Sequence, residues 1–205
     1  MKKKAAHLFL IIFLSGFINP ASAFYFPKHK KKGAFAQGQS NAQLGMGMFS
    51  LIKPKTDSLL YYGKVETKVL APIQFRYEYA LTDNLGMGGM IAMANSHVKV
   101  TDNTDPDNVN GFDYFYFLFA ARFSYHVKME SEFIDPYVVS TVGFTLTGSS
   151  LYGPSNPFAE SKKTFLWGIH AGANVYFLPD FMAAFVEVGY GMAVLNVGIT
   201  FKFGT

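Results

Sequence analysis

Apolar and polar residues alternate with a period of two along much of this chain. The stretch Gly111–Val127 shows the pattern most clearly, because every second residue from Phe115 to Val127 is apolar. The intervening positions carry Arg122, Ser124 and His126. Successive side chains of a β-strand leave opposite faces, so this period predicts a strand with one apolar and one mixed face. Such a strand fits either a soluble sheet with the phenylalanines in its core or a membrane barrel with them in lipid.

The same alternation predicts eight strands separated by turn-rich segments. We place them at about residues 41–51, 64–81, 85–98, 111–127, 137–146, 165–177, 181–190 and 195–203. Tight connections follow the second and sixth strands, and an intermediate one at 128–135 follows the fourth. Long polar connections follow the first, third and fifth, at 53–63, 97–111 and 147–163, whereas the last link near 191–194 is short. Short turns at one end and long loops at the other are typical of outer-membrane barrels, and both termini then lie at the periplasmic, short-turn end.

The N-terminal segment predicts export. Lys2–Lys4 precede an apolar stretch at Leu8–Ile18, and Ala21-Ser22-Ala23 forms a small-residue cleavage site, which together are typical of a signal peptide cleaved after Ala23. Residues 24–39 contain the basic cluster KHKKK and no period, and we expect a disordered periplasmic tail there. The predicted organisation is a signal peptide at 1–23, the tail at 24–39 and one barrel domain at 40–205.

Composition favours the membrane alternative. Aromatic residues make up 17% and charged residues 16% of the chain, against about 25% charged in soluble domains. A soluble barrel would show water a face rich in Lys and Glu, whereas the non-apolar faces here are mostly Gly, Ala, Ser, Thr, Asn and His. Beyond the signal peptide no apolar run reaches the length of a spanning helix, and a closed barrel is the other structure that satisfies its backbone in lipid. The tyrosines lie mostly near predicted strand ends, where an aromatic girdle would form.

We therefore predict an all-β, eight-stranded, antiparallel up-and-down transmembrane barrel in a bacterial outer membrane. Its lipid-facing residues are expected to be Phe75, Tyr77, Phe115, Phe117, Phe119, Phe123, Trp167, Ile169, Val186, Val188, Ile199 and Phe201.

The terminal strands also carry a resemblance. The segments DPYVVSTVGF, WGIHAGANVYFLPD, FVEVGYGM and LNVGITFKF resemble the closing strands of the small OmpA/OmpX-like outer membrane β-barrel proteins of the porin-like superfamily. The usual terminal aromatic is here Phe203, followed by two further residues. The resemblance implies a monomeric eight-stranded barrel in a Gram-negative bacterium, and it transfers no catalytic residue.

Few charges lie on the predicted inner faces. An eight-stranded barrel is only wide enough for its own side chains, and a buried charge needs a partner. We therefore expect Arg76, Glu78, Arg122 and Glu187 to form one paired network across the lumen, with Lys202 as a further inward charge. The network is expected to act as a plug that fixes the shape of the barrel. The alternative is a gate or a narrow ion path.

Other candidate chemistry is weak. The histidines of the exported chain, at 29, 97, 126 and 170, lack the spacing of a metal site, and without cysteine there is no thiolate site or disulfide. Ser124 and His126 share a face as a nucleophile and its base would, but no third orienting residue is visible. The acidic loop at 101–110 does not fit a calcium-binding EF-hand, although weak divalent-cation bridging to lipopolysaccharide phosphates stays open.

These observations predict a non-enzymatic integral outer-membrane protein with a structural or surface-interaction role and no cofactor. The alternatives are a porin-like conduit for small solutes, an accessory subunit of an envelope complex and, least favoured, a lipid-modifying barrel enzyme. Expected partners are outer-membrane lipids and lipopolysaccharide, with periplasmic chaperones and the barrel-assembly machinery during biogenesis. The formal charge of +4 rests mostly on the signal peptide and tail, so it does not indicate nucleic acid.

Overall fold

The computed structural model describes residues 34–52, 63–102, 109–152, 162–178 and 181–204. The predicted signal peptide, its cleavage site and the KHKKK cluster lie outside these residues. The described strands are β1 (Ser40–Ser50), β2 (Gly63–Val69), β3 (Ile73–Ala80), β4 (Leu85–Asp102), β5 (Val109–His126), β6 (Ile134–Tyr152), β7 (Lys162–Leu178), β8 (Met182–Tyr190) and β9 (Ala193–Phe203). Within the same ranges, no helix is long and apolar enough to cross a membrane.

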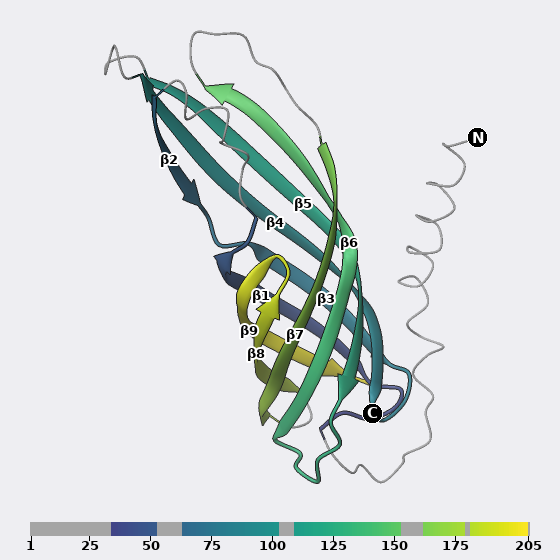
Figure 1. Ribbon diagram of the computed structural model, residues 1–205. Coiled ribbons are helices and arrows are strands. Elements are labelled where there is room, and N and C mark those ends of the chain that lie inside the picture. The colour runs from purple at the N-terminus through teal and green to yellow at the C-terminus, as the bar shows by residue number, and fades with distance from the viewer. Residues whose placement is uncertain (1–33, 53–62, 103–108, 153–161, 179–180, 205) are drawn as a thin grey trace, which may run out of the picture. The chain divides into compact units, whose positions relative to one another are not determined.

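Eight of these strands close into a barrel (Figure 1). The order around it is β4-β3-β1-β9-β8-β7-β6-β5, and β5 pairs with β4 to complete the ring. Every pairing is antiparallel. The predicted all-β, eight-stranded up-and-down barrel is therefore confirmed.

The second predicted strand, 64–81, is divided in the structure. β2 and β3 both pair with β4, in the same direction, and the Leu70 amide still donates to the Asn95 carbonyl at 2.9 Å, but residues 71 and 72 interrupt the ladder. Pro72 has no N–H to donate, so it cannot continue a ladder in the middle of a sheet. Its carbonyl oxygen instead accepts a bond from the Gly47 amide at 2.8 Å. β2 thus stands outside the closed ring, paired to the far part of β4.

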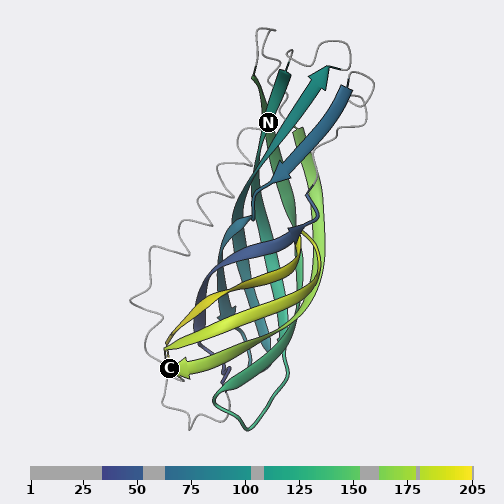
Figure 2. The ribbon, with the colours of Figure 1, turned by 90° about the vertical axis from the view of Figure 1, so that its left-hand side faces the viewer.

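Four strands are much longer than the other four. β4, β5, β6 and β7 have 17–19 residues, whereas β1, β3, β8 and β9 have 8–11. The extra length continues past one end of the ring as a curved sheet, which we call the wall (Figure 2). The wall comprises β2 and the residues at or beyond the rung of Ala94 in the ladder, which are 94–102, 109–116, 147–152 and 162. Nine residues of β4, 94–102, reach about 30 Å at about 3.4 Å per residue.

The predicted strand ends were wrong on this side of the barrel. β4 and β6 were expected to end near Val98 and Leu146, and much of the predicted loops 97–111 and 147–163 is strand. The reason is that polar residues replace the apolar ones beyond this level, so alternation fades while the hydrogen-bond ladder continues. The opposite end, which we call the turn end, carries the short connections 81–84 and 127–133, and there the Phe181 amide donates to the Leu178 carbonyl.

The two faces of the barrel have opposite character. Among the predicted lipid-facing residues, nine side chains are 40–55% exposed (Phe75, Phe115, Phe119, Phe123, Trp167, Ile169, Val186, Val188, Ile199). Tyr77, Phe117 and Phe201 alternate with buried neighbours on the same outer face and are half-buried. Polar and charged side chains, including Arg76 and Glu187, are buried inside. A soluble barrel would show the reverse, so the outer surface is built for lipid.

Small residues let the strands and side chains inside the barrel approach closely. A Cβ atom added to Gly88 would collide with the Tyr77 carbonyl oxygen, and one added to Gly143 would collide with the Phe119 carbonyl oxygen. At Gly45 the aromatic ring of Phe185 occupies the space that a side chain would need. The glycines on the inner faces therefore make room for the large residues that fill the lumen.

Candidate functional site

The centre of the lumen is an ionic cluster built from four strands. β3, β5, β6 and β8 contribute Arg76, Arg122, Tyr137 and Glu187, which we call the ionic centre. Glu187 Oε1 accepts bonds from Arg76 Nη1 at 2.8 Å, Arg122 Nη2 at 2.6 Å and the Tyr137 hydroxyl at 2.9 Å. All four residues are buried. One carboxylate on β8 is therefore bonded to side chains of β3, β5 and β6 across the lumen.

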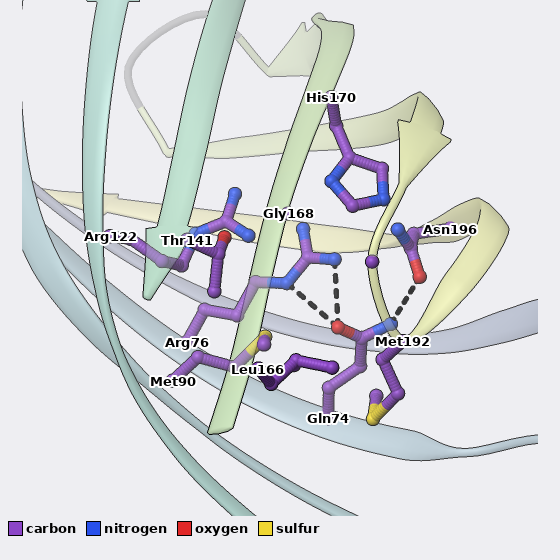
Figure 3. Close-up of a pocket in the computed structure, with 11 residues that line it drawn as sticks. Gln74, Arg76, Met90, Arg122, Thr141, Leu166, Gly168, His170, Met192 and Asn196 are labelled. Carbon is purple, nitrogen blue, oxygen red and sulfur yellow. Dashed lines mark hydrogen bonds between the residues drawn. The ribbon is translucent and has the colours of Figure 1, made fainter. Parts of the chain in front are cut away.

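A second set of polar groups fixes Arg76. The Gln74 side-chain oxygen accepts from Arg76 Nε at 3.1 Å and Nη2 at 2.8 Å, while the Gln74 amide donates to Asn196 Oδ1 at 2.6 Å (Figure 3). The Arg76 guanidinium also lies 4.7 Å from the centre of the Phe185 ring, within range of a cation–π contact. The Arg76 side chain is thus fixed in one position by Gln74, Glu187 and the Phe185 ring.

Apolar side chains close the lumen on the wall side of the ionic centre. Met90, Ala92, Leu118 and Met192 form a buried cluster, against which Ile52 and Leu166 pack. Between this cluster and the two arginines lies a cavity of about 10 Å³, room for about one water-sized species. Its lining includes Arg76, Arg122, Thr141 and His170, and Figure 3 shows these side chains around it. This cavity is too small for a solute of several atoms.

Glu78 does not join the arginines, which corrects the prediction of one four-residue network. It lies nearer the turn end with Ser124, His126 and Asp135, which together we call the turn-end cluster. The Ser124 hydroxyl donates to Glu78 Oε1, and His126 Nε2 lies 3.3 Å from the same oxygen. His126 Nδ1 lies 2.7 Å from Asp135 Oδ1. The predicted charges therefore divide between two clusters, although Glu78 and Arg122 both lie opposite Gly88 in the ladder.

The turn-end cluster contains the third residue that the sequence did not reveal for a serine triad. His126 Nε2 is 3.2 Å from the Ser124 hydroxyl oxygen, and Asp135 orients the other ring nitrogen. The chemistry nevertheless fails. Both ring nitrogens face carboxylate oxygens, so both carry protons and His126 cannot accept the proton of serine. Glu78 beside the hydroxyl would also repel a developing oxyanion. The cluster places a serine, a histidine and an aspartate in the order of a catalytic triad, but its interactions are those of an ion-pair network.

Residues Ala34–Gln39, which we call the mouth segment, cover this cluster at the turn end. They were predicted to belong to the disordered tail, but in the structure Phe35 is only 6% exposed and stacks on the His126 ring at 3.5 Å. The Gly38 amide donates to the Ala80 carbonyl, and Lys202 Nζ donates to the Ala34 carbonyl at 2.8 Å. The mouth segment therefore closes the lumen from the turn end.

Comparison with known proteins finds structures with a similar architecture but assigns the chain to no family. No protein-family profile matches the chain, and no curated protein matches it. Among solved structures it is similar to the outer membrane protein OprG from Pseudomonas aeruginosa, with a TM-score of 0.52 and 11% identity over 85% of this chain and 99% of that one. It is also similar to Ail from Yersinia pestis in complex with the heparin analogue sucrose octasulfate (0.48, 13%, 80% and 98%). The N-terminal β-barrel domain of Pseudomonas aeruginosa OprF is a third (0.42, 15%, 82% and 99%).

The chain has the fold of a small outer-membrane β-barrel. At these identities the likeness shows the fold alone, so the role of the barrel has to be argued from its own residues.

Two features of the lumen escaped the sequence reasoning. Tyr137 was assigned to an aromatic girdle but points inward to Glu187, and Asp135 was assigned to a connection but begins β6 with its side chain in the turn-end cluster. The available signal was the spacing along β6. Asp135, Tyr137 and Val139 occupy every second position, so they share one face of the strand, and that face is the inner one. In the described parts of the chain, no group of three or more His, Asp or Glu is arranged to hold a metal ion.

The outer face of the wall carries exposed charges above the apolar surface. Lys64 pairs with Glu66 at 2.9 Å on β2, and His97 contacts Asp113 at 2.7 Å across β4 and β5. Lys99 lies opposite Glu66 in the ladder, and Lys163 lies on the same outer face of β7 next to Leu146. The polar part of the wall thus begins where the apolar surface ends.

Proposed function

We propose that this protein is a non-enzymatic, non-conducting barrel of the bacterial outer membrane, whose wall forms an interaction surface outside the cell. The observation that carries the proposal is the filled lumen. An apolar cluster, the ionic centre, the turn-end cluster and the mouth segment follow one another along it. A conduit needs an open path, whereas the cavity beside the ionic centre has room for about one water-sized species.

The wall supports the interaction part of the proposal. Strands that only needed to cross the bilayer could end at about 9–11 residues, as β1, β8 and β9 do. The additional length of β4–β7 places an ordered, charged sheet beyond the apolar surface. Lys64 and Lys99 on the wall and Lys163 beside it suit the phosphates of lipopolysaccharide, which we propose as the lipid partner.

Planar-bilayer recording tests the absence of conduction. We expect no stepwise conductance from the purified wild-type protein or from Glu187→Ala, under conditions in which an open porin gives regular steps. Discrete steps in wild type would refute the proposal in favour of a conduit. Silence in wild type with steps in Glu187→Ala would instead establish a gate.

Cysteine labelling tests which end of the barrel is outside. The chain contains no cysteine, so a single introduced thiol is labelled without background. A membrane-impermeant maleimide added to intact cells is expected to label Lys99→Cys on the wall and not Asp83→Cys at the turn end. Both variants should react after lysis. The reverse pattern in intact cells would overturn the proposed orientation and the surface role with it.

A further inference from the structure

The inward-facing charges of the barrel do not balance at every level. In the described strands they are Arg76, Glu78, Arg122, His126, Asp135, Glu187 and Lys202. Near the turn end, Glu78 and Asp135 contact His126, and Lys202 donates to the Ala34 carbonyl. Because carboxylate oxygens flank both ring nitrogens of His126, the ring is an imidazolium, so this end of the lumen holds two cations and two carboxylates. The turn end of the lumen is neutral.

The ionic centre is different, because two arginines share one carboxylate. Arg76 and Arg122 both bind Glu187 Oε1, and Glu78 is already engaged by Ser124 and His126. The two arginines and Glu187 together carry one net positive charge, and Glu78, which lies opposite Gly88 in the ladder as Arg122 does, pairs with Ser124 and His126. A further anion beside the arginines would balance that charge, because a buried charge without a counter-charge costs several kcal/mol.

The cavity above the ionic centre lies where that anion is needed. Both guanidinium groups line it, and Arg122 uses only Nη2 for Glu187. The Thr141 hydroxyl also lines the cavity, is 3% exposed and has no hydrogen-bond partner in the structure. Figure 3 shows Arg122 and Thr141 side by side on one flank of the cavity and Arg76 next to them. The flank therefore offers two cations and one unused hydroxyl donor.

The size of the cavity restricts the ligand. At about 10 Å³ it accepts a species of about the size of a water molecule, which excludes phosphate, sulfate and carboxylates. His170, on another side, donates from Nε2 to the Ala193 carbonyl at 3.0 Å, so its neutral ring has a lone pair at Nδ1. The anion position is consequently on the side of Arg76, Arg122 and Thr141.

We propose that this cavity binds one halide ion, chloride under ordinary conditions, as a resident counter-ion of the lumen. The ion is held by Arg122 and Arg76 through charge and by the Thr141 hydroxyl through a hydrogen bond. It completes the charge balance of the plug and is independent of whether the wall binds a partner.

Chlorine-35 NMR of the barrel in a chloride-free detergent tests the site directly. Titrated chloride should show excess line broadening that saturates and that bromide displaces. We expect Arg122→Gln to weaken chloride binding at least tenfold. The smaller change Thr141→Val, which keeps the shape of the side chain, is expected to weaken it about tenfold through the lost hydrogen bond. Lys64→Gln removes an exposed positive charge as the matched control and should leave the titration unchanged.

Heat-modified mobility on gels checks that each variant is folded, and Thr141→Val keeps the test available if Arg122→Gln does not fold. Bromide-soaked crystals should show an anomalous peak beside Arg122 and Thr141. Absence of saturable broadening would mean that water fills the cavity and would overturn the proposal. Broadening that persists in Thr141→Val and Arg122→Gln but falls in Lys64→Gln would assign it to the surface, with the same consequence.

Discussion

Replacing Glu187 by glutamine is the sharpest test of how this lumen is held together. The substitution keeps the volume of the side chain and removes only its charge. Glu187 is fully buried and its Oε1 accepts bonds from Arg76, Arg122 and Tyr137. Removing one partner of a buried ion pair typically costs 3–5 kcal/mol, so we expect the free energy of unfolding to fall by about 3–5 kcal/mol.

The charge count predicts an asymmetry between the partners. Arg76→Gln leaves Arg122 with Glu187 as a balanced pair, whereas Glu187→Gln leaves two arginines without a carboxylate. Arg76→Gln still loses its bonds to Gln74 and its contact with the Phe185 ring. We therefore expect it to cost about 1–3 kcal/mol, less than Glu187→Gln.

Equilibrium unfolding by urea in phospholipid vesicles measures these differences. Trp167 is the single tryptophan and lies on the lipid-facing surface, so its fluorescence reports the loss of the barrel from the bilayer. Glu66→Gln, an exposed carboxylate paired with Lys64, is the matched control and should change stability by less than about 1 kcal/mol. If the Glu187→Gln barrel were as stable as wild type, the ion pairs of Glu187 with Arg76 and Arg122 would not be what stabilises the lumen. A larger loss in Arg76→Gln than in Glu187→Gln would refute the charge count.

Three further predictions concern other parts of the barrel. Phe117→Arg, on the lipid-facing surface, should lower stability in vesicles by about 2–4 kcal/mol, while Phe117→Leu stays much closer to wild type; equal losses would contradict the lipid-facing assignment. Gly143→Val places a branched side chain against the Phe119 carbonyl and should prevent formation of the heat-modifiable folded band, whereas Gly148→Val, where the space is open, should fold normally. A fluorophosphonate probe should leave Ser124 unlabelled in mass spectra, because His126 has no free lone pair to act as a base; stoichiometric labelling would show a working nucleophile.

Alternation along the strands was enough to predict the barrel and its two faces. Residues such as Phe119 and Trp167 repeat every second position, and a period of two has only one structural meaning when it extends over many residues. The identity of the inward charges followed for the same reason. Their pairing did not, because Glu78 and Arg122 both lie opposite Gly88 in the ladder, and only the packing of side chains inside the closed lumen brings Glu78 to Ser124 and His126.

The sequence by itself determined the strand-rich architecture, the direction of the apolar face and the scarcity of charge inside, since each is a property of local spacing and composition. Only the tertiary structure decided three other features. It extended β4–β7 into the wall, because backbone hydrogen bonds continue where side-chain alternation stops. It folded the mouth segment back over His126, a contact between residues 35 and 126. It also gave two arginines one carboxylate, because closing the ring brings β3, β5 and β8 to the same level of the lumen.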